Sequence, residues 1–379
     1  MFRHLLGLLV GIDLILTVIC QSRSFFDMNC PQNKAANFRK CEVFVDSHLD
    51  FTDFKQWTSE LERAVKISLD VTCSSKRVFF IPWPMKARGL TKLNVKGCIL
   101  DGFFSESFTP THLKDELQEL SLDNCVITVN MKQVIRLLST PLTQEIDCGQ
   151  QTLQRSVWRN ITYTPMATNK QDDIETENFV WNFSFDELLN RIRHRGYRCK
   201  YLNLTYLDEG ISTSRSKYHF HLMTAYSDFP KLHTFLSPNN GYSNVPQELT
   251  DWRKSFPQLR LLDLSDNFIT QFNFLGAPST EKISKSKPLV VNLSKNSITE
   301  IPEDMQDYLT GSVPIIVDLT GNPLSCDCNF LRYKHYVMNV LKRFKQYEKL
   351  SGITCYSAIM HQKIQLANYR NNNCFKRTY

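Results

Sequence analysis

After its first 22 residues, the sequence contains no run of about 18 consecutive apolar residues, the length that a helix needs to cross a bilayer. We therefore expect no membrane span in the mature chain. The sequence also lacks a nucleophile elbow, a phosphate-binding loop, a zinc-binding motif and a convincing pair of carboxylates. These absences argue against an enzyme, and no motif indicates a cofactor or a metal site.

A strong excess of charge of one sign is missing as well. The net charge of +7 is modest for 379 residues, and Lys and Arg are spread along the chain. Proteins that bind nucleic acids usually concentrate positive charge on one surface. The composition therefore indicates no nucleic-acid partner.

The first 22 residues have the pattern of a secretory signal peptide. Arg3 and His4 precede an apolar run from residue 5 to residue 19, which only Asp13 interrupts. We expect residues 1–22 to be removed and the mature protein to be secreted and extracellular. An uncleaved membrane anchor is the alternative, although the run is short for a bilayer span and contains a carboxylate.

Cysteine is present in a number that suits this compartment. Cleavage after Ser22 would leave eleven of the twelve cysteines. Disulfides form in the secretory pathway, so an odd number predicts at least one free or intermolecular cysteine.

Three segments between residues 259 and 328 repeat the pattern LxLxxN. Its positions are occupied by Leu262, Leu264 and Asn267, then by Val291, Leu293 and Asn296, and then by Val317, Leu319 and Asn322. The asparagines are 29 and 26 residues apart, close to the length of a leucine-rich repeat. In a short strand the side chains alternate between faces, so one repeat cannot bury its apolar face alone. An asparagine after the strand has enough donors and acceptors to satisfy backbone groups where the chain turns inward.

Weaker copies of the pattern occur earlier in the chain. The segments 90–100 and 117–127 place Cys98 and Cys125 where the later repeats have asparagine, and segments 199–207 and 232–240 resume the pattern. A thiol is small and easily buried, so we interpret both cysteines as buried free thiols rather than catalytic or metal-binding groups. The register of residues 128–198 is not fixed by the sequence.

Cysteines also mark both ends of the repeats. At the N-terminal end we predict a cap over residues 23–89, with a Cys30–Cys41 disulfide, a helix near residues 53–65, and no evident partner for Cys73. A bond between Cys148 and Cys199 is a further interpretation. At the C-terminal end, the sequence NPLSCDC is followed by two more cysteines, which gives the set Cys326, Cys328, Cys355 and Cys374.

This C-terminal pattern resembles the cysteine-flanked cap of extracellular leucine-rich repeat proteins, including Toll-like receptors and Slit-type adhesion and guidance proteins. The resemblance implies that Cys326 pairs with Cys355 and Cys328 with Cys374. Tyr333 stands where the cap of that family usually has tryptophan. Long gaps between the cysteines and a secretory signal favour disulfides over a zinc site.

The predicted fold is an α/β leucine-rich repeat solenoid. A curved parallel sheet forms its concave face, helices and irregular segments form its convex face, and disulfides staple its caps. The expected domains are a signal peptide at 1–22, an N-terminal cap at 23–89, repeats at 90–325 with an irregular segment near 128–198, and a C-terminal cap at 326–379.

The outward side chains of such a sheet are free to bind a ligand. Lys92 should lie beside Glu119, and Lys96 beside Asp123, as surface ion pairs or as a charged docking patch. The outward positions that we select as candidate ligand-binding residues are Lys92, Lys96, Glu119, Asp123, Asp263 and Asp318.

N-glycosylation sequons limit which part of this face is accessible. They occur at Asn160, Asn182, Asn203 and Asn292. Asn203 and Asn292 are expected at outward strand positions, where glycans would project from the concave face. A protein ligand should then avoid those two strands.

These observations predict a secreted recognition or adhesion protein that binds an extracellular protein or glycan, in innate immunity or tissue patterning as the resemblance implies. Two alternatives remain: the ectodomain of a Toll-like transmembrane receptor that lacks its span, and a small leucine-rich matrix protein. The sequence defines neither the ligand nor the oligomeric state.

Overall fold

The computed structural model divides the chain into two compact units, residues 1–197 and 198–379. We call them unit 1 and unit 2 and treat each by itself. The signal segment 1–22, Cys148, Asn182 and Cys374 lie outside the described residues. The structure describes residues 25–33, 37–46, 49–62, 65–74, 77–82, 85–102, 113–129, 150–165, 199–210, 227–250, 252–274, 288–303, 305, 307–310 and 314–370.

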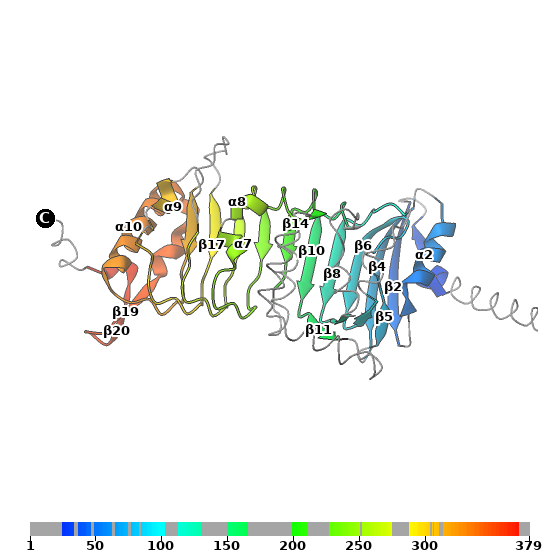
Figure 1. Cartoon of the computed structure of the whole chain (residues 1–379), viewed down its shortest axis with the longest axis horizontal. Helices are drawn as coiled ribbons and strands as arrows, with labels where there is room; N and C mark the ends of the chain where they lie inside the picture. The colour runs from blue at the N-terminus through cyan, green and yellow to red at the C-terminus, as the bar shows by residue number, and fades with distance from the viewer. Residues whose placement is uncertain are drawn as a thin grey trace, which may run out of the picture. The chain divides into compact units, whose positions relative to one another are not determined.

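Unit 1 is a stack of coils whose first strands form one sheet (Figure 1). All neighbours in this sheet are parallel except the first pair, which is antiparallel. The strands follow one another in the order β1 (Gln32–Asn33), β2 (Phe38–Val45), β4 (Lys66–Cys73), β6 (Leu90–Lys96), β8 (Glu119–Asp123) and β10 (Arg155–Arg159). The parallel sheet therefore begins at β2, inside the segment that the sequence assigns to the N-terminal cap.

Alternation along each strand explains why the coils stack. In β8, Leu120 and Leu122 are buried, while Glu119, Ser121 and Asp123 point to the other face. The inward side chains of successive strands meet in the core, and burying a leucine contributes on the order of 1.5–3 kcal/mol. Stacking thus supplies the apolar contacts that a single coil lacks.

A second parallel sheet covers the opposite side of the unit 1 core. It has 5 strands, and the inward side chains Phe79, Leu100 and Ile127 are each fully buried beneath it. The sequence does not predict this sheet, because strands of two to four residues are too short to show a period. Its strands are β3 (Leu49–Asp50), β5 (Val78–Phe80), β7 (Ile99–Asp101), β9 (Val126–Val129) and β11 (Thr162–Pro165).

An aromatic cluster and a disulfide close the N-terminal end of unit 1. Helix α2 (Phe51–Glu60) starts at Asp50, whose carboxylate accepts a hydrogen bond from the backbone N of Thr52 at 2.7 Å. The helix is shorter than predicted and begins two residues earlier. Cys30 and Cys41 are disulfide-bonded. The buried rings that pack around the helix are Phe26, Phe51, Phe54, Trp57 and Phe79.

A second disulfide in unit 1 corrects the sequence interpretation. Cys73 pairs with Cys98, so Cys98 is not a free thiol and Cys73 has a partner. The two cysteines meet because β4 and β6 are paired neighbours, and their register brings the C-terminal ends of these strands side by side. Cys125, one coil further on, is free and buried as predicted, and burial raises the pKa of its thiol to about 11.

Unit 2 repeats the same construction with shorter strands. Its parallel sheet runs through β13 (Tyr206–Asp208), β15 (Thr234–Leu236), β16 (Leu261–Asp263), β17 (Leu289–Asn292) and β18 (Ile315–Asp318). The inward positions aligned by the register are Leu207, Phe235, Leu262, Val291 and Val317. Strands β12 (Cys199–Lys200) and β14 (Ser227–Asp228) form a small separate sheet, and the short helices are α7 (Gln247–Thr250), α8 (Trp252–Ser255) and α9 (Asp307–Thr310).

A ladder of buried asparagines ties each coil of unit 2 to the preceding coil. Asn267 donates through Nδ2 to the backbone oxygens of Ser237 at 3.1 Å and Leu264 at 3.0 Å. Its Oδ1 accepts from the backbone N of Asn240 at 2.8 Å and of Tyr242 at 3.1 Å. This is the role expected for the repeated asparagine. Side chains that likewise donate through Nδ2 to a backbone oxygen of the preceding coil are those of Asn240, Asn296 and Asn322.

The residue before each ladder asparagine of unit 2 has a left-handed backbone, and so has the residue before the equivalent position in three coils of unit 1. Glycine, asparagine and aspartate tolerate this conformation better than other residues. Lys295 is the exception, and a Cβ at the neighbouring Gly321 would approach Lys295 Cγ within 3.1 Å. The set, with φ between +51° and +79°, is Gly97, Asn124, Asn160, Asn239, Asp266, Lys295 and Gly321.

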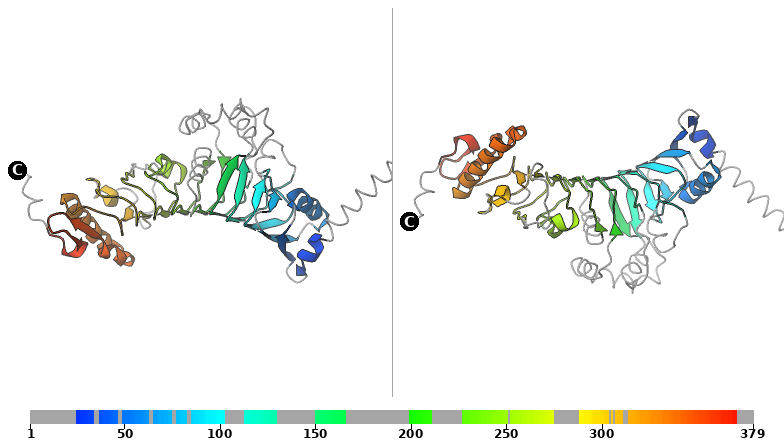
Figure 2. Two further views of the ribbon diagram at one scale, coloured as in Figure 1. Left: turned by 90° about the horizontal axis from the view of Figure 1, so that it is seen from below. Right: turned by 90° about the horizontal axis from the view of Figure 1, so that it is seen from above.

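The C-terminal cap seals the last strand of unit 2 with helix α10 (Cys328–Arg343) (Figure 2). The Tyr336 hydroxyl donates to the backbone oxygen of Ile315 at 2.7 Å and accepts from the backbone N of Val317 at 2.9 Å. The Tyr333 hydroxyl donates to the backbone oxygen of Val317 at 3.0 Å. These hydroxyls satisfy the outer edge of β18, which would otherwise expose unpaired backbone groups.

The rest of the cap is a short, disulfide-bonded tail. Cys326 is bonded to Cys355. Cys328 is also in a disulfide, whereas Cys374, the partner implied by the family resemblance, lies outside the described residues. The remaining elements are η1 (Lys345–Gly352), β19 (Thr354–Ser357), β20 (Gln362–Gln365) and η2 (Leu366–Asn368).

We predict that unit 2 loses stability in strong alkali because of these two tyrosines. Burial raises the pKa of Tyr336, and burial together with the nearby Tyr336 raises that of Tyr333. A raised pKa in the folded state means that the stabilisation is complete below the unfolded value, near pH 10, and is lost as the pH rises above it. Denaturant midpoints at pH 8 and pH 11 measure the effect.

The variant Tyr333→Phe/Tyr336→Phe should flatten this alkaline decline. It should also lower stability at pH 8 by about 1–3 kcal/mol for each lost hydroxyl, because backbone groups of β18 lose their partners. Tyr356→Phe, at an exposed tyrosine of β19, is the control. An equally steep decline in the double variant would refute the assignment.

Candidate ligand-binding surface

The outward side chains of β2, β4, β6, β8 and β10 form three rows across unit 1, and we call this surface the unit 1 face. The register places side chains of successive strands next to one another. The first row is Lys40, Ser68, Lys92, Glu119 and Arg155; the second is Glu42, Asp70, Asn94, Ser121 and Val157; the third is Phe44, Thr72, Lys96, Asp123 and Arg159.

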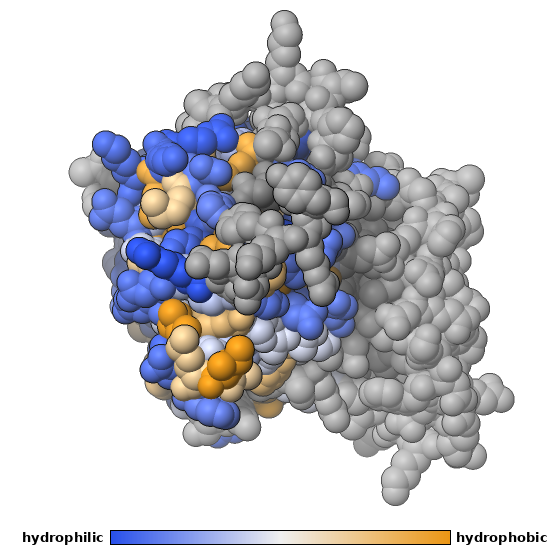
Figure 3. Space-filling model, turned by 90° about the vertical axis from the view of Figure 1, so that its left-hand side faces the viewer, coloured by the Kyte–Doolittle hydropathy of each residue, from blue (hydrophilic) through white to orange (hydrophobic). Residues whose placement is uncertain are grey.

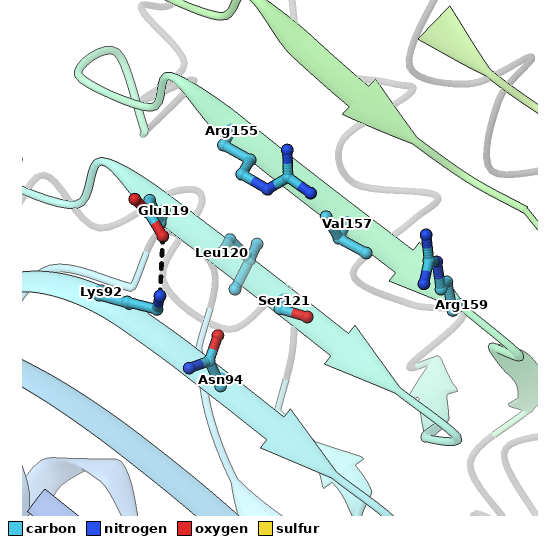
Figure 4. Close-up of a pocket in the computed structure, with 8 residues that line it drawn as sticks. All are labelled: Lys92, Asn94, Glu119, Leu120, Ser121, Arg155, Val157 and Arg159. Carbon is cyan, nitrogen blue, oxygen red and sulfur yellow. Dashed lines mark ion pairs between the residues drawn. The ribbon is translucent and has the colours of Figure 1, made fainter.

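A pocket of about 220 Å³ lies on this face over β6, β8 and β10 (Figure 4). Lys92 Nζ and Glu119 Oε2 form an ion pair of 3.0 Å on one side. Arg155 and Arg159 project from β10 on the other side, with Val157 between them. Asn94 and Ser121 supply neutral polar groups, and Leu120 completes the lining.

Charge is distributed unevenly over the unit 1 face. Lys40 forms an ion pair with Glu42 and lies 4.0 Å from Asp70, which also accepts a hydrogen bond from Asn94. The hydrogen bond and charge of Lys40 lower the pKa of the Glu42 carboxyl. The carboxylates of β2 and β4 are therefore engaged within the face, while the guanidinium groups are concentrated on β10.

Four of the predicted ligand-binding residues come together on this face. Lys92 and Glu119 are register partners and form the expected ion pair, with 43% and 47% of their side chains exposed. Lys96 and Asp123 are also register partners. An exposed ion pair contributes about 0–1 kcal/mol, so the fold does not depend on the Lys92–Glu119 pair.

The other two predicted residues lie in unit 2, on β16 and β18. Asp263 accepts hydrogen bonds from the backbone N of Ser265 at 2.9 Å and from Asn292 Nδ2 at 3.1 Å. It is partly exposed, next to the sequon asparagine of β17.

The selection of Asp318 as a ligand-binding residue is wrong. Asp318 is only 3% exposed, and its oxygens bind Lys349 Nζ at 2.7 Å and the Thr320 hydroxyl at 2.6 Å. Burial opposes ionisation of this carboxyl, but hydrogen bonds from Lys349 and Thr320 outweigh it and lower the pKa. Because Lys349 belongs to η1, this aspartate anchors the C-terminal cap to the sheet.

Three of the sequon asparagines are among the described residues. Asn292 is at the outward end of β17, as expected. Asn203 precedes β13 in a turn rather than lying on a strand, because the register makes Leu207 the inward residue of that coil. Asn160 follows β10, and its Nδ2 donates to Asn124 Oδ1 at 2.8 Å.

Sequence reasoning missed the arginines of β10. The strand carries Ser156 and Trp158 at the inward positions, where the pattern calls for aliphatic residues. Trp158 Nε1 donates to Ser156 Oγ at 2.7 Å, which makes the buried serine acceptable. One feature of the sequence could have revealed this coil. Asn160 precedes Ile161 as Asn124 precedes Cys125, and the backbone of both asparagines is left-handed.

The described residues include no group of three or more His, Cys, Asp or Glu side chains suited to holding a metal ion. They also include no helix with the length and hydrophobicity of a bilayer span.

The coils, the asparagine ladder and the cysteine-containing caps form a leucine-rich repeat solenoid with disulfide-bonded caps. The protein Toll of Drosophila melanogaster is 36% identical over 121 residues, which are 31% of this chain and 10% of Toll. The chain thus matches only a tenth of the length of that relative. No model of a protein family matches the chain.

Two solved structures align with the chain over most of its length. Human 5T4 (Wnt-activated inhibitory factor 1, trophoblast glycoprotein) aligns with a TM-score of 0.43 and 15% identity, covering 90% of this chain and 95% of that one. A chain from an octameric complex of latrophilin 3, Unc5D and FLRT2 aligns with a TM-score of 0.39 and 14% identity, covering 92% of this chain and 98% of that one.

Proposed function

We propose that this chain is a secreted recognition or adhesion protein that binds an extracellular protein or glycan on the unit 1 face. The pocket over β6, β8 and β10 is the observation that carries the proposal. Its polar lining residues lie on the outward side of the sheet and do not fill the core. A role in innate immunity or tissue patterning rests on the family resemblance alone.

The chemistry of the pocket favours a ligand with an anionic group. Arg155 and Arg159 each carry a planar guanidinium, which suits carboxylates and sulfates. Val157 lies between them but is only 8% exposed, so it adds little apolar surface. Acidic peptides and sulfated or sialylated glycans carry such anionic groups.

Sequon positions support the choice of unit 1 over unit 2. None of the four sequons falls on an outward strand position of β2, β4, β6, β8 or β10. Asn292 is outward in unit 2, where an attached oligosaccharide would project over Asp263 and keep a protein ligand away.

We predict that reversing the charge of β10 weakens ligand binding. The purified wild-type chain is screened against arrays of extracellular protein domains and of glycans, and each hit is measured again with Arg155→Glu/Arg159→Glu. Replacing two attractive charges by two repulsive ones should weaken binding at least about tenfold, or ~1.4 kcal/mol.

The control is Arg77→Glu, which reverses the charge of an exposed arginine beside β5 of the second sheet. It makes one such reversal away from the unit 1 face, should leave binding unchanged, and is compared with the single variants Arg155→Glu and Arg159→Glu as well as with the double variant. Equal thermal midpoints would show that all chains are folded. Ligands that bind the double variant as tightly as the wild type would contradict the proposal.

A second candidate is the ectodomain of a Toll-like transmembrane receptor. The identity to Toll over 121 residues favours it. Sequencing of full-length transcripts tests this candidate: messages that continue past Tyr379 into an apolar span would support it, and messages that all stop there would not.

A further inference from the structure

The C-terminal cap carries an exposed hairpin with an apolar tip. Strands β19 and β20 pair in antiparallel fashion, and residues 358–361 connect them. Ile359 is 93% exposed, Met360 62% and Tyr356, next to the turn, 47%. Turns are usually built from polar residues and glycine, so Ile and Met at a tip are unusual and need an explanation.

The base of this hairpin is fixed, although its tip is exposed. Cys355 in β19 is bonded to Cys326, and Tyr356 exchanges backbone hydrogen bonds with Leu324 and Cys326. Lys334 of α10 donates to the backbone oxygens of Ala367 and Tyr369, just beyond β20. The tip therefore projects from a hairpin whose base is held by a disulfide and hydrogen bonds, and it is not part of the core.

The surroundings of the tip are basic. Lys363 is the register partner of Tyr356, and Arg370 follows η2; both are exposed, with no ion-pair partner among the residues that the structure describes. The sequence from Lys349 to Tyr379 contains no Asp or Glu. The end of the molecule that bears this cap shows apolar groups together among hydrophilic ones (Figure 3).

The size of the apolar tip helps to identify its partner. A standard protein interface buries about 800 Å² on each partner and needs a broad complementary surface. Three side chains on a projecting turn are far smaller than that. A lipid bilayer needs no shaped pocket: apolar side chains enter the interface, and cations contact anionic headgroups.

We propose that the hairpin tip docks on a membrane that contains anionic phospholipid. Ile359 and Met360 enter the headgroup and acyl boundary, Tyr356 lies at the interface, and Lys363 and Arg370 contact lipid phosphates. This surface lies in unit 2 and is separate from the unit 1 face, so it does not depend on the proposed function.

The test uses the full secreted chain and sedimentation with phosphatidylcholine vesicles, with and without phosphatidylserine. We expect binding to the anionic vesicles, weaker binding to neutral ones, and partial release by added salt. Ile359→Asp/Met360→Asp should reduce partitioning at least about tenfold, because it places charge where apolar side chains enter the lipid.

Two controls separate this proposal from general effects. Phe268→Asp changes a 66% exposed apolar residue in unit 2 outside the cap, and it should bind vesicles as the wild type does. Arg155→Glu/Arg159→Glu should also bind vesicles normally, even if it loses a ligand. The thermal midpoint of each variant shows that the chain is folded.

Several results would overturn the proposal. They are an absence of vesicle binding by the wild type, vesicle binding that the tip variant retains in full, and equal loss in the tip variant and Phe268→Asp. Capture of heparin or of a soluble protein without vesicle association would likewise exclude a lipid partner.

Discussion

Replacing Asn296 by alanine should lower the free energy of unfolding of unit 2 by about 3 kcal/mol. In the folded chain Asn296 Nδ2 donates to the backbone oxygen of Leu264 at 2.9 Å, and Oδ1 accepts from the backbone N of Ile269 at 3.0 Å. Both groups are in the interior, and alanine leaves them without these partners. Each buried unsatisfied group costs about 1–3 kcal/mol.

Denaturant unfolding of the full chain, followed by circular dichroism, measures this loss. Asn329→Ala is the matched control in the same unit, because that side chain accepts an exposed hydrogen bond from Arg332 at 3.2 Å. The control should cost well under 1 kcal/mol. Similar losses in the two variants would mean that the ladder does not hold the coils together.

Removing the Cys326–Cys355 bond is the second change with a large expected effect. The bond closes a loop with a sequence separation of 29 residues. By loop-closure entropy its loss in Cys326→Ser/Cys355→Ser should cost about 3–4 kcal/mol. The cap would also lose the covalent link between the start of α10 and β19.

Thermal and denaturant midpoints of the oxidised proteins provide the measurement. Cys125→Ser controls for the loss of sulfur, because Cys125 is buried and forms no disulfide. We expect the double variant to unfold at a clearly lower denaturant concentration than this control. If the two midpoints coincide, the bond contributes nothing to the stability of unit 2.

The sequence predicted the coils in which the LxLxxN pattern is repeated. Leu262, Val291 and Val317 take equivalent inward positions, and each is followed by a ladder asparagine, so the register there could be read directly. The coil of β10 was not recognised, because a hydrogen-bonded serine and tryptophan replace the aliphatic pair. Hydrophobic periodicity does not detect such a compensated pair.

Other features depend on which coils are neighbours, and a linear pattern does not show this. Cys73 and Cys98 pair because β4 and β6 are adjacent. Asp318 is covered because η1, which contains Lys349, folds back onto the last strand, although the residue looks like any outward aspartate in the repeat. Lys92 and Glu119, which line one side of the pocket, were among the candidate residues selected from the sequence, whereas Arg155 and Arg159 on β10 were not.

The asparagine ladder has a consequence for how chains of this kind can change length. The side-chain amides of Asn267, Asn296 and Asn322 bond only within their own coil and to the coil before it, so these three junctions use the same chemistry. Excision of residues 268–296 would join Asn267 to Ser297 and offer the following coil an identical amide at the seam. Duplication or loss of one whole period therefore preserves every junction, whereas a cut at any other length leaves an amide facing the wrong backbone groups.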